Sequence, residues 1–145
     1  MRRVAILPFV VVAFAFAACG GDDGSGSDGS QDPAALEGKS WILTQMLTAG
    51  GQTQIVEVGV SASFDGTAIS GDSGCNSYHA SYEASGNEIS FGPIAGTQMA
   101  CPEAESSTEA RYLQLLQGVA TFETSGRSMS MSDADGTPVL QFMQG

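Results

Sequence analysis

Four short glycine-containing turns divide the chain after residue 61 into arms in which apolar and polar residues alternate. Asp65-Gly66 and Asp135-Gly136 lie between such arms, as do Ser85-Gly86-Asn87 and a turn at Gly126. Asp-Gly between alternating arms is a strong signal for a β-hairpin, because glycine reaches the positive φ angles that tight turns need. A period of two places successive side chains on opposite faces of a sheet. The pattern therefore predicts a mainly antiparallel β protein.

Two further strands are expected before the first of these turns. "SWILTQML", residues 40–47, places Trp41 and Leu43 on one face. "TQIVEVGVSASF", residues 53–64, is expected to run as one strand into the Asp65-Gly66 turn. With the hairpin arms, the sequence predicts about eight short strands, and we expect Trp41 in the core.

Residues 102–117 depart from the alternating pattern and predict a helix. Pro102 suits the first helical position, and Glu103 and Glu105 suit the positive end of the helix dipole. Ser106 and Glu109 offer an alternative start one turn later, as a capping box in which each side chain bonds the other's backbone N–H. Both starts remain open from the sequence.

The predicted helix is amphipathic and ends at a glycine. Leu113 and Leu116 lie on one stripe with Glu109, Tyr112 and Leu115, and Gly118 suits the end of a helix. One helix packed on a curved antiparallel sheet is an α+β, β-barrel-like design. We expect the helix to cover the open side of the sheet.

The N-terminal residues 1–18 have the composition of a bacterial lipoprotein signal peptide. Arg2 and Arg3 precede an apolar run from residue 4 to 18, and "FAAC" ends at Cys19. Such a segment is too short and wrongly flanked for a membrane-spanning helix. We expect Cys19 to be lipidated as the mature N-terminus. The alternative is an ordinary secretory peptide cleaved near Ala18, with Cys19 free.

Residues 19–35 are expected to be the lipidated cysteine followed by a Gly/Ser/Asp-rich flexible tether, because they lack large apolar residues.

Removal of Arg2 and Arg3 leaves three basic residues against 16 acidic ones, a net charge of about −13 instead of −11. Such a charge disfavours nucleic acid as a partner. We expect the domain outside the cytoplasm, bound to the membrane through its lipid. With Gly20 after the cysteine, sorting in a Gram-negative host would favour the outer membrane.

Residues 36–145 resemble the META domain family, which includes the HslJ-like bacterial lipoproteins. The resemblance rests on two motifs, Gly71-x-x-Gly74-Cys75-Asn76 with Tyr78, and Thr97-x-Met99-Ala100-Cys101, and on their order relative to "RYLQLL" and "MSMSDADGTPVLQF". It implies a cracked β-barrel with one helix. It also implies an association with envelope stress and antibiotic tolerance, in a family for which no enzymatic activity is established. We therefore expect a non-enzymatic envelope protein that acts through contacts with an unknown protein partner, without a cofactor.

Three cysteines in an exported chain, one of them lipidated, leave Cys75 and Cys101 for a disulfide. Two buried free thiols are the alternative. Cys-His catalysis with His79 is disfavoured, because alternation along residues 78–84 turns His79 away from the apolar face. A zinc site is disfavoured because two cysteines and one histidine are too few ligands.

The glycines and Asn76 are expected to be structural. Gly71 and Gly74 would bracket a tight corner at positive φ, and Asn76 would bond nearby backbone and tolerate a left-handed conformation. A second function remains open, in which the barrel holds a small apolar ligand or lipid. Its adaptable wall would be the methionines Met99, Met129, Met131 and Met143.

Overall fold

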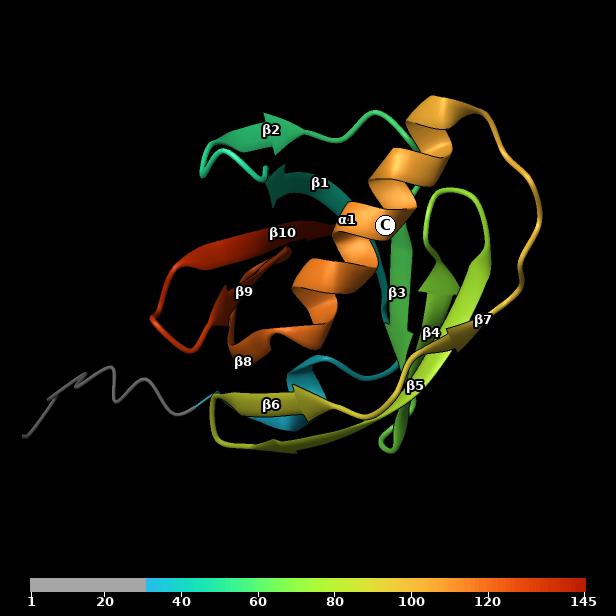
Figure 1. Ribbon diagram of the computed structural model, residues 1–145. Helices are drawn as coiled ribbons and strands as arrows, with labels where there is room; N and C mark the ends of the chain where they lie inside the picture. The colour runs from blue at the N-terminus through green and yellow to red at the C-terminus, as the bar shows by residue number, and fades with distance from the viewer. Residues whose placement is uncertain (1–30) are drawn as a thin grey trace, which may run out of the picture.

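Antiparallel pairing closes the sheet into a barrel in the computed structural model, which describes residues 31–145 (Figure 1). Eight strands form the ring, and β10 pairs back with β1 from Trp41↔Gln144 to Met46↔Leu140. In ring order the strands are β1 (Ser40–Leu47), β3 (Ser61–Phe64), β4 (Ala68–Asp72), β5 (Ser77–Ser85), β6 (Glu88–Phe91), β8 (Val119–Ser125), β9 (Ser128–Asp133) and β10 (Pro138–Gln144). Two short strands lie outside the ring: β2 (Thr53–Ile55) pairs with β1, and β7 (Ala95–Gly96) pairs with β5.

The predicted hairpins are all present. Gly66, Gly86, Gly126 and Gly136 each have a positive φ in the turns that join β3 to β4, β5 to β6, β8 to β9 and β9 to β10. The prediction of one strand over residues 53–64 was wrong. That segment divides into β2 and β3, which pair with β1 at Gln45↔Ile55 and Ile42↔Ser61. Three steps along β1 face six steps along the partner segment, so residues 56–60 leave the ladder.

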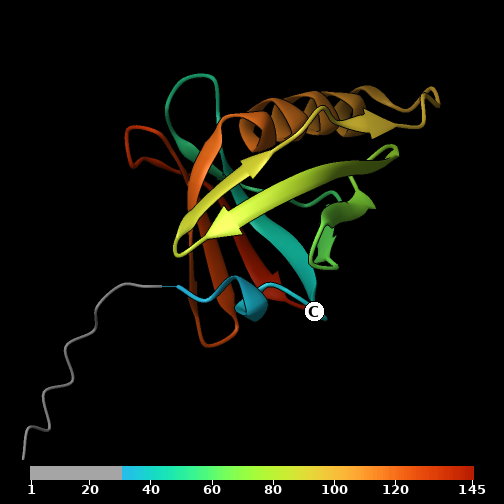
Figure 2. The same ribbon diagram turned by 90° about the horizontal axis from the view of Figure 1, so that it is seen from below.

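The single α-helix within residues 31–145, α1 (Glu103–Gln117), lies across one mouth of the barrel (Figures 1 and 2). It buries Tyr112, Leu115 and Leu116. Pro102 occupies the N-cap position rather than the first helical one, and Gly118 caps the C-terminus. A short 3-10 helix, η1 (Pro33–Ala35), lies at the opposite end of the barrel (Figure 2). Within residues 31–145, no helix is long and apolar enough to cross a membrane.

Inward-facing side chains fill the barrel with one continuous apolar core. Trp41 is fully buried, as predicted, and its indole N–H donates to the carbonyl oxygen of Leu36 at 3.1 Å. The four methionines do not line one pocket inside the barrel, which was the alternative left open by the sequence. Alternation along β9 turns Met129 and Met131 into the core, where they are fully buried. Met99 and Met143 are exposed, at 64% and 44%.

Gly71 is required by a neighbouring strand rather than by its own backbone angle. The expected positive φ at Gly71 was wrong, since only Gly74 of the pair has one, at 100°. A Cβ atom at Gly71 would instead collide with the carbonyl oxygen of Ser61 on the adjacent β3. The residue therefore lets two strands approach each other closely.

We predict that Gly71→Ala destabilises the domain by about 2 kcal/mol, because backbone must shift to admit the methyl group. Gly59→Ala is the matched control, since a Cβ atom there meets nothing within 4 Å. Urea unfolding of both variants measures the effect. Equal midpoints for the two would contradict the steric explanation.

Candidate functional site

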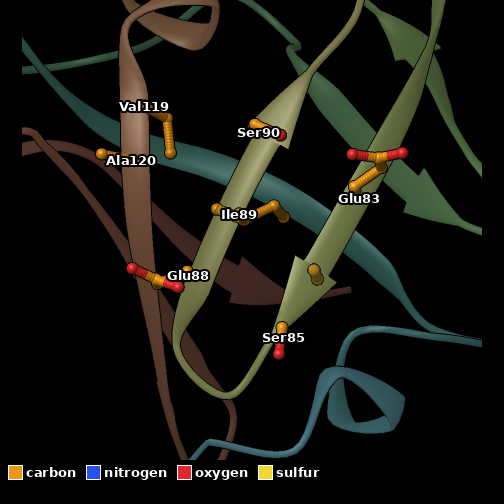
Figure 3. A pocket seen from close by; sticks show the side chains of 8 residues that line it. Glu83, Ser85, Glu88, Ile89, Ser90, Val119 and Ala120 are labelled. Atoms are coloured by element: carbon orange, nitrogen blue, oxygen red, sulfur yellow. The ribbon is translucent and has the colours of Figure 1, made fainter.

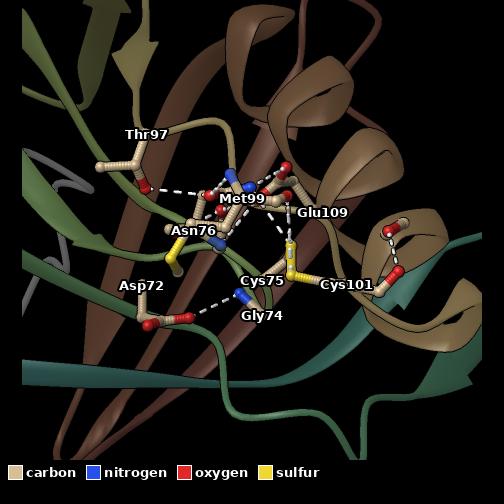
Figure 4. Close-up of a disulfide and its surroundings, with 10 residues drawn as sticks. Asp72, Gly74, Cys75, Asn76, Thr97, Met99, Cys101 and Glu109 are labelled. Atoms are coloured by element: carbon tan, nitrogen blue, oxygen red, sulfur yellow. Dashed lines mark hydrogen bonds between the residues drawn. A yellow bond between two sulfur atoms is a disulfide. The ribbon is translucent and has the colours of Figure 1, made fainter.

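The two predicted sequence motifs meet at one corner of the barrel, where β4 turns into β5 (Figure 4). The turn is closed by the N–H of Ser73, which donates to the carbonyl oxygen of Asn76 at 2.8 Å. Cys75 in this turn forms the predicted disulfide with Cys101, with a Cα–Cα distance of 5.9 Å. The bond joins the corner to the segment that leads into α1.

Asn76 is the centre of the corner and is 95% buried. Its Oδ1 atom accepts from the Thr97 hydroxyl at 2.9 Å and from the Met99 backbone N–H at 2.7 Å. The second motif is therefore held by the Asn76 side chain as well as by the disulfide. Asn76 does not use the left-handed conformation that asparagine tolerates, since in residues 31–145 only glycines have positive φ. The amide bonds segments more than 20 residues away rather than nearby backbone.

Glu109 of α1 completes the corner, and this role was not predicted. Its carboxylate accepts from the Ser73 hydroxyl, from the Asn76 backbone N–H at 2.9 Å and from Asn76 Nδ2 at 3.0 Å. The capping box with Ser106 does not form, because α1 begins one turn earlier. Partial burial raises the pKa of Glu109, but the hydrogen bonds from Ser73 and Asn76 outweigh that effect and lower it.

Tyr78 anchors the same region to the helix. Its hydroxyl lies 2.6 Å from that of Tyr112 and donates to the carbonyl oxygen of Ser61 at 3.0 Å. The two rings pack edge to face at a centroid distance of 5.5 Å. Burial raises the pKa of both phenols, so both remain neutral hydrogen-bonding groups.

The corner does not assemble a thiol-imidazole pair. The Cys75 sulfur is bonded to Cys101. His79 lies on the exposed side of β5, as the alternation predicted, between register partners Ser70 and Ala95. Within residues 31–145, no three His, Cys, Asp or Glu side chains are grouped so that they could hold a metal ion.

A second feature, which we call the seam slot, lies in the barrel wall between β6 and β8 (Figure 3). These strands share one register pair, Glu88↔Thr121, whereas β5 and β6 share four. Beyond that pair, β6 and β8 are not paired. At the far end of β6, the carbonyl oxygen of Phe91 accepts instead from the side-chain amide of Gln117, at 3.0 Å. The slot has a volume of about 440 Å³ and is lined by Glu83, Ala84, Ser85, Glu88, Ile89, Ser90, Val119 and Ala120.

The seam slot combines an apolar floor with an acidic rim. Ile89 and Val119 are almost fully buried, so only their edges contribute to the floor. Glu83 and Glu88 are exposed. In the β5–β6 pairing, Glu83 lies opposite Ser90 and Glu88 lies opposite Ser85. The sequence carried no signal for this slot, because it depends on how far the β6–β8 ladder extends.

A small closed antiparallel barrel, with one helix over its mouth and a disulfide at its corner, is the class of protein that these features define. The META domain matches residues 34–145. The chain therefore belongs to the META domain family, as the motifs predicted.

Solved structures share the fold. An NMR structure of a protein from Burkholderia xenovorans is 25% identical, with a TM-score of 0.67, over 96% of this chain and 99% of that one. A second NMR structure is 18% identical, with a TM-score of 0.58, over 78% and 94%. A crystal structure of a DUF4847 family protein from Bacteroides vulgatus is 9% identical, with a TM-score of 0.56, over 74% and 93%. A search of curated proteins finds no match.

We predict that Glu109→Gln lowers the free energy of unfolding by about 1–2 kcal/mol at pH 7, because an amide cannot accept from all three donors. The pKa of Glu109 is lower in the folded chain, so its stabilisation is present above the unfolded value of about 4.3 and is lost as the pH falls through the folded value. The difference between wild type and variant should therefore shrink below about pH 4. Denaturant titrations from pH 7 to 3 measure it, with the exposed Glu57→Gln as control. A pH-independent difference would exclude this role for the carboxylate.

We predict that Cys75→Ala/Cys101→Ala lowers the free energy of unfolding by about 3.5 kcal/mol, because the bond closes a loop with a sequence separation of 26. Urea unfolding measures the loss, and reduced wild type should match the double variant. Ellman's reagent should find no thiol in the denatured, non-reduced chain from Gly20 onward. Two thiols in that assay would rule out the disulfide.

Proposed function

We propose that this chain is a membrane-anchored envelope lipoprotein that acts through surface contacts and not as an enzyme. The proposal rests on one observation: the side chains best suited to catalysis hold the fold together instead. Cys75 is oxidised, and both oxygens of the Glu109 carboxylate accept hydrogen bonds that hold the corner together. The expected signal peptide, residues 1–18, the lipidated Cys19 and most of the tether lie outside the described residues.

Family membership supports a role in stress or antibiotic tolerance through an envelope protein partner, as the resemblance implies. The described domain presents a strongly acidic surface to such a partner. Of the 16 acidic residues, Asp22, Asp23 and Asp28 precede residue 31 and the other 13 belong to the domain, against three basic residues. Each basic side chain donates to backbone carbonyl oxygens of the domain itself: Lys39, Arg111 and Arg127.

A second function, the binding of a small ligand, is favoured at the seam slot rather than inside the barrel. The interior is occupied by large, fully buried side chains, among them Trp41, Phe122 and Phe142. The seam slot is open to solvent, and its volume of about 440 Å³ lies in the usual range of ligand pockets. We therefore place ligand binding on the outside of the barrel wall.

We predict that Cys19→Ser moves the protein from the membrane fraction to the soluble fraction, because the acyl chains are its expected anchor. Fractionation of cells that express each form, followed by immunoblotting, measures this. Asp28→Asn in the tether is the control and should stay with the membrane. Retention of Cys19→Ser in the membrane fraction would overturn the anchoring proposal.

A further inference from the structure

We propose that the seam slot binds a cationic amphiphile, a small molecule with one positively charged group on an apolar body. This inference rests on the second function proposed above and names the ligand chemistry of that site. The argument uses three properties of the slot: its apolar floor, its two carboxylates and its position beside the expected membrane tether.

The floor selects an apolar body. Ala84 and Ile89 are register partners on the inner side of the β5–β6 hairpin, and both reach the slot together with Val119 and Ala120 of β8. Ala84 and Ala120 are half-buried, and the exposed edges of Ile89 and Val119 lie beside them. An apolar group placed there would remove this surface from water, at roughly 25 cal/mol per Å².

The rim selects a positive charge. Glu83 and Glu88 are the two charged residues that line the slot, and no basic side chain lines it in the described part of the chain. Glutamate carboxylates are negatively charged at neutral pH. The domain around them has the same sign, so its field raises the local concentration of cations and repels anionic amphiphiles. A neutral amphiphile gains only the contribution of the floor.

The position of the slot supports a ligand drawn from the membrane surface. Gln31, the first described residue, accepts from the backbone N–H of Thr124 and from its hydroxyl, both at 2.9 Å. Gln31 also shares a surface hollow with Asn87 and Thr121, next to the pair Glu88↔Thr121 that bounds the slot. The predicted tether from Cys19 to Gln31 has a reach of roughly 20 Å. An anchored domain would thus hold the slot within reach of amphiphiles at the membrane surface.

The test uses the ¹⁵N-labelled chain from Gly20 to Gly145, which keeps the barrel core because the buried apolar side chains of the described residues all lie between Leu36 and Phe142. Decyltrimethylammonium, decyl maltoside and decyl sulfate are titrated below their micelle-forming concentrations. We expect the cation to shift the amide resonances of Ile89, Val119 and Ala120 most, with the neutral probe weaker and the anion weakest.

Glu83→Gln/Glu88→Gln should weaken binding of the cation about threefold to tenfold and leave the neutral probe unchanged, since each exposed charge pair contributes a small factor. Glu57→Gln/Glu103→Gln is the matched control, with the same change in net charge at exposed sites away from the slot, and should bind as wild type. Raised salt should weaken the wild type toward the double variant.

The outcomes separate the two proposals. Equal affinity for all three probes at the slot would overturn the charge selectivity while keeping ligand binding there. Shifts of the same size in the two double variants would assign the effect to net charge and also overturn the inference. Absence of any shift at the slot would overturn both the inference and the ligand-binding function, and would leave the anchoring proposal to its own fractionation test.

Discussion

The buried side chain of Asn76 is the interaction on which the rest of the corner depends. One amide joins the β4–β5 turn, the segment before α1 and α1 itself, through its bonds to Met99 and Glu109. A buried amide must satisfy its donors and acceptor, so these partners fix one arrangement and penalise others. The disulfide beside it acts mainly on the unfolded chain instead, because it lowers the number of conformations that this chain can adopt. In this chain, the two motifs therefore form a junction between the sheet and its helix.

Most of the strands could be predicted because their signals are local. The arms around Gly66, Gly86, Gly126 and Gly136 contain both their alternation and their turns, so no distant contact is needed to recognise them. The same holds for residues 40–47, which match β1. Residues 53–64 could not be divided correctly from the sequence, because the division depends on their register against β1, which leaves residues 56–60 out of the ladder.

The sequence predicted the two motifs that form the corner, but it did not predict the part that Glu109 takes in it. Counting cysteines led to the disulfide, and period two placed His79 outside. Glu109 was missed because the same residue fits a capping box, and local sequence cannot show that its partners lie 33 and 36 residues earlier. We expected glycine at position 71 because of a positive φ angle. Glycine is needed there because a side chain would collide with Ser61 on the neighbouring strand. The seam slot depends on ladder length, which no short pattern specifies.

The pairing of β1 with β10 has a consequence for how the chain acquires its structure. The last strand lies between the first strand and β9, so the ring stays open until residues near 144 are available. Contacts between chain ends form slowly because a long loop must be closed first. A chain released gradually from its N-terminus, at the ribosome or across a membrane, therefore cannot complete the barrel early. β10 follows the other ring strands along the chain, so the barrel stays open until β10 has been released.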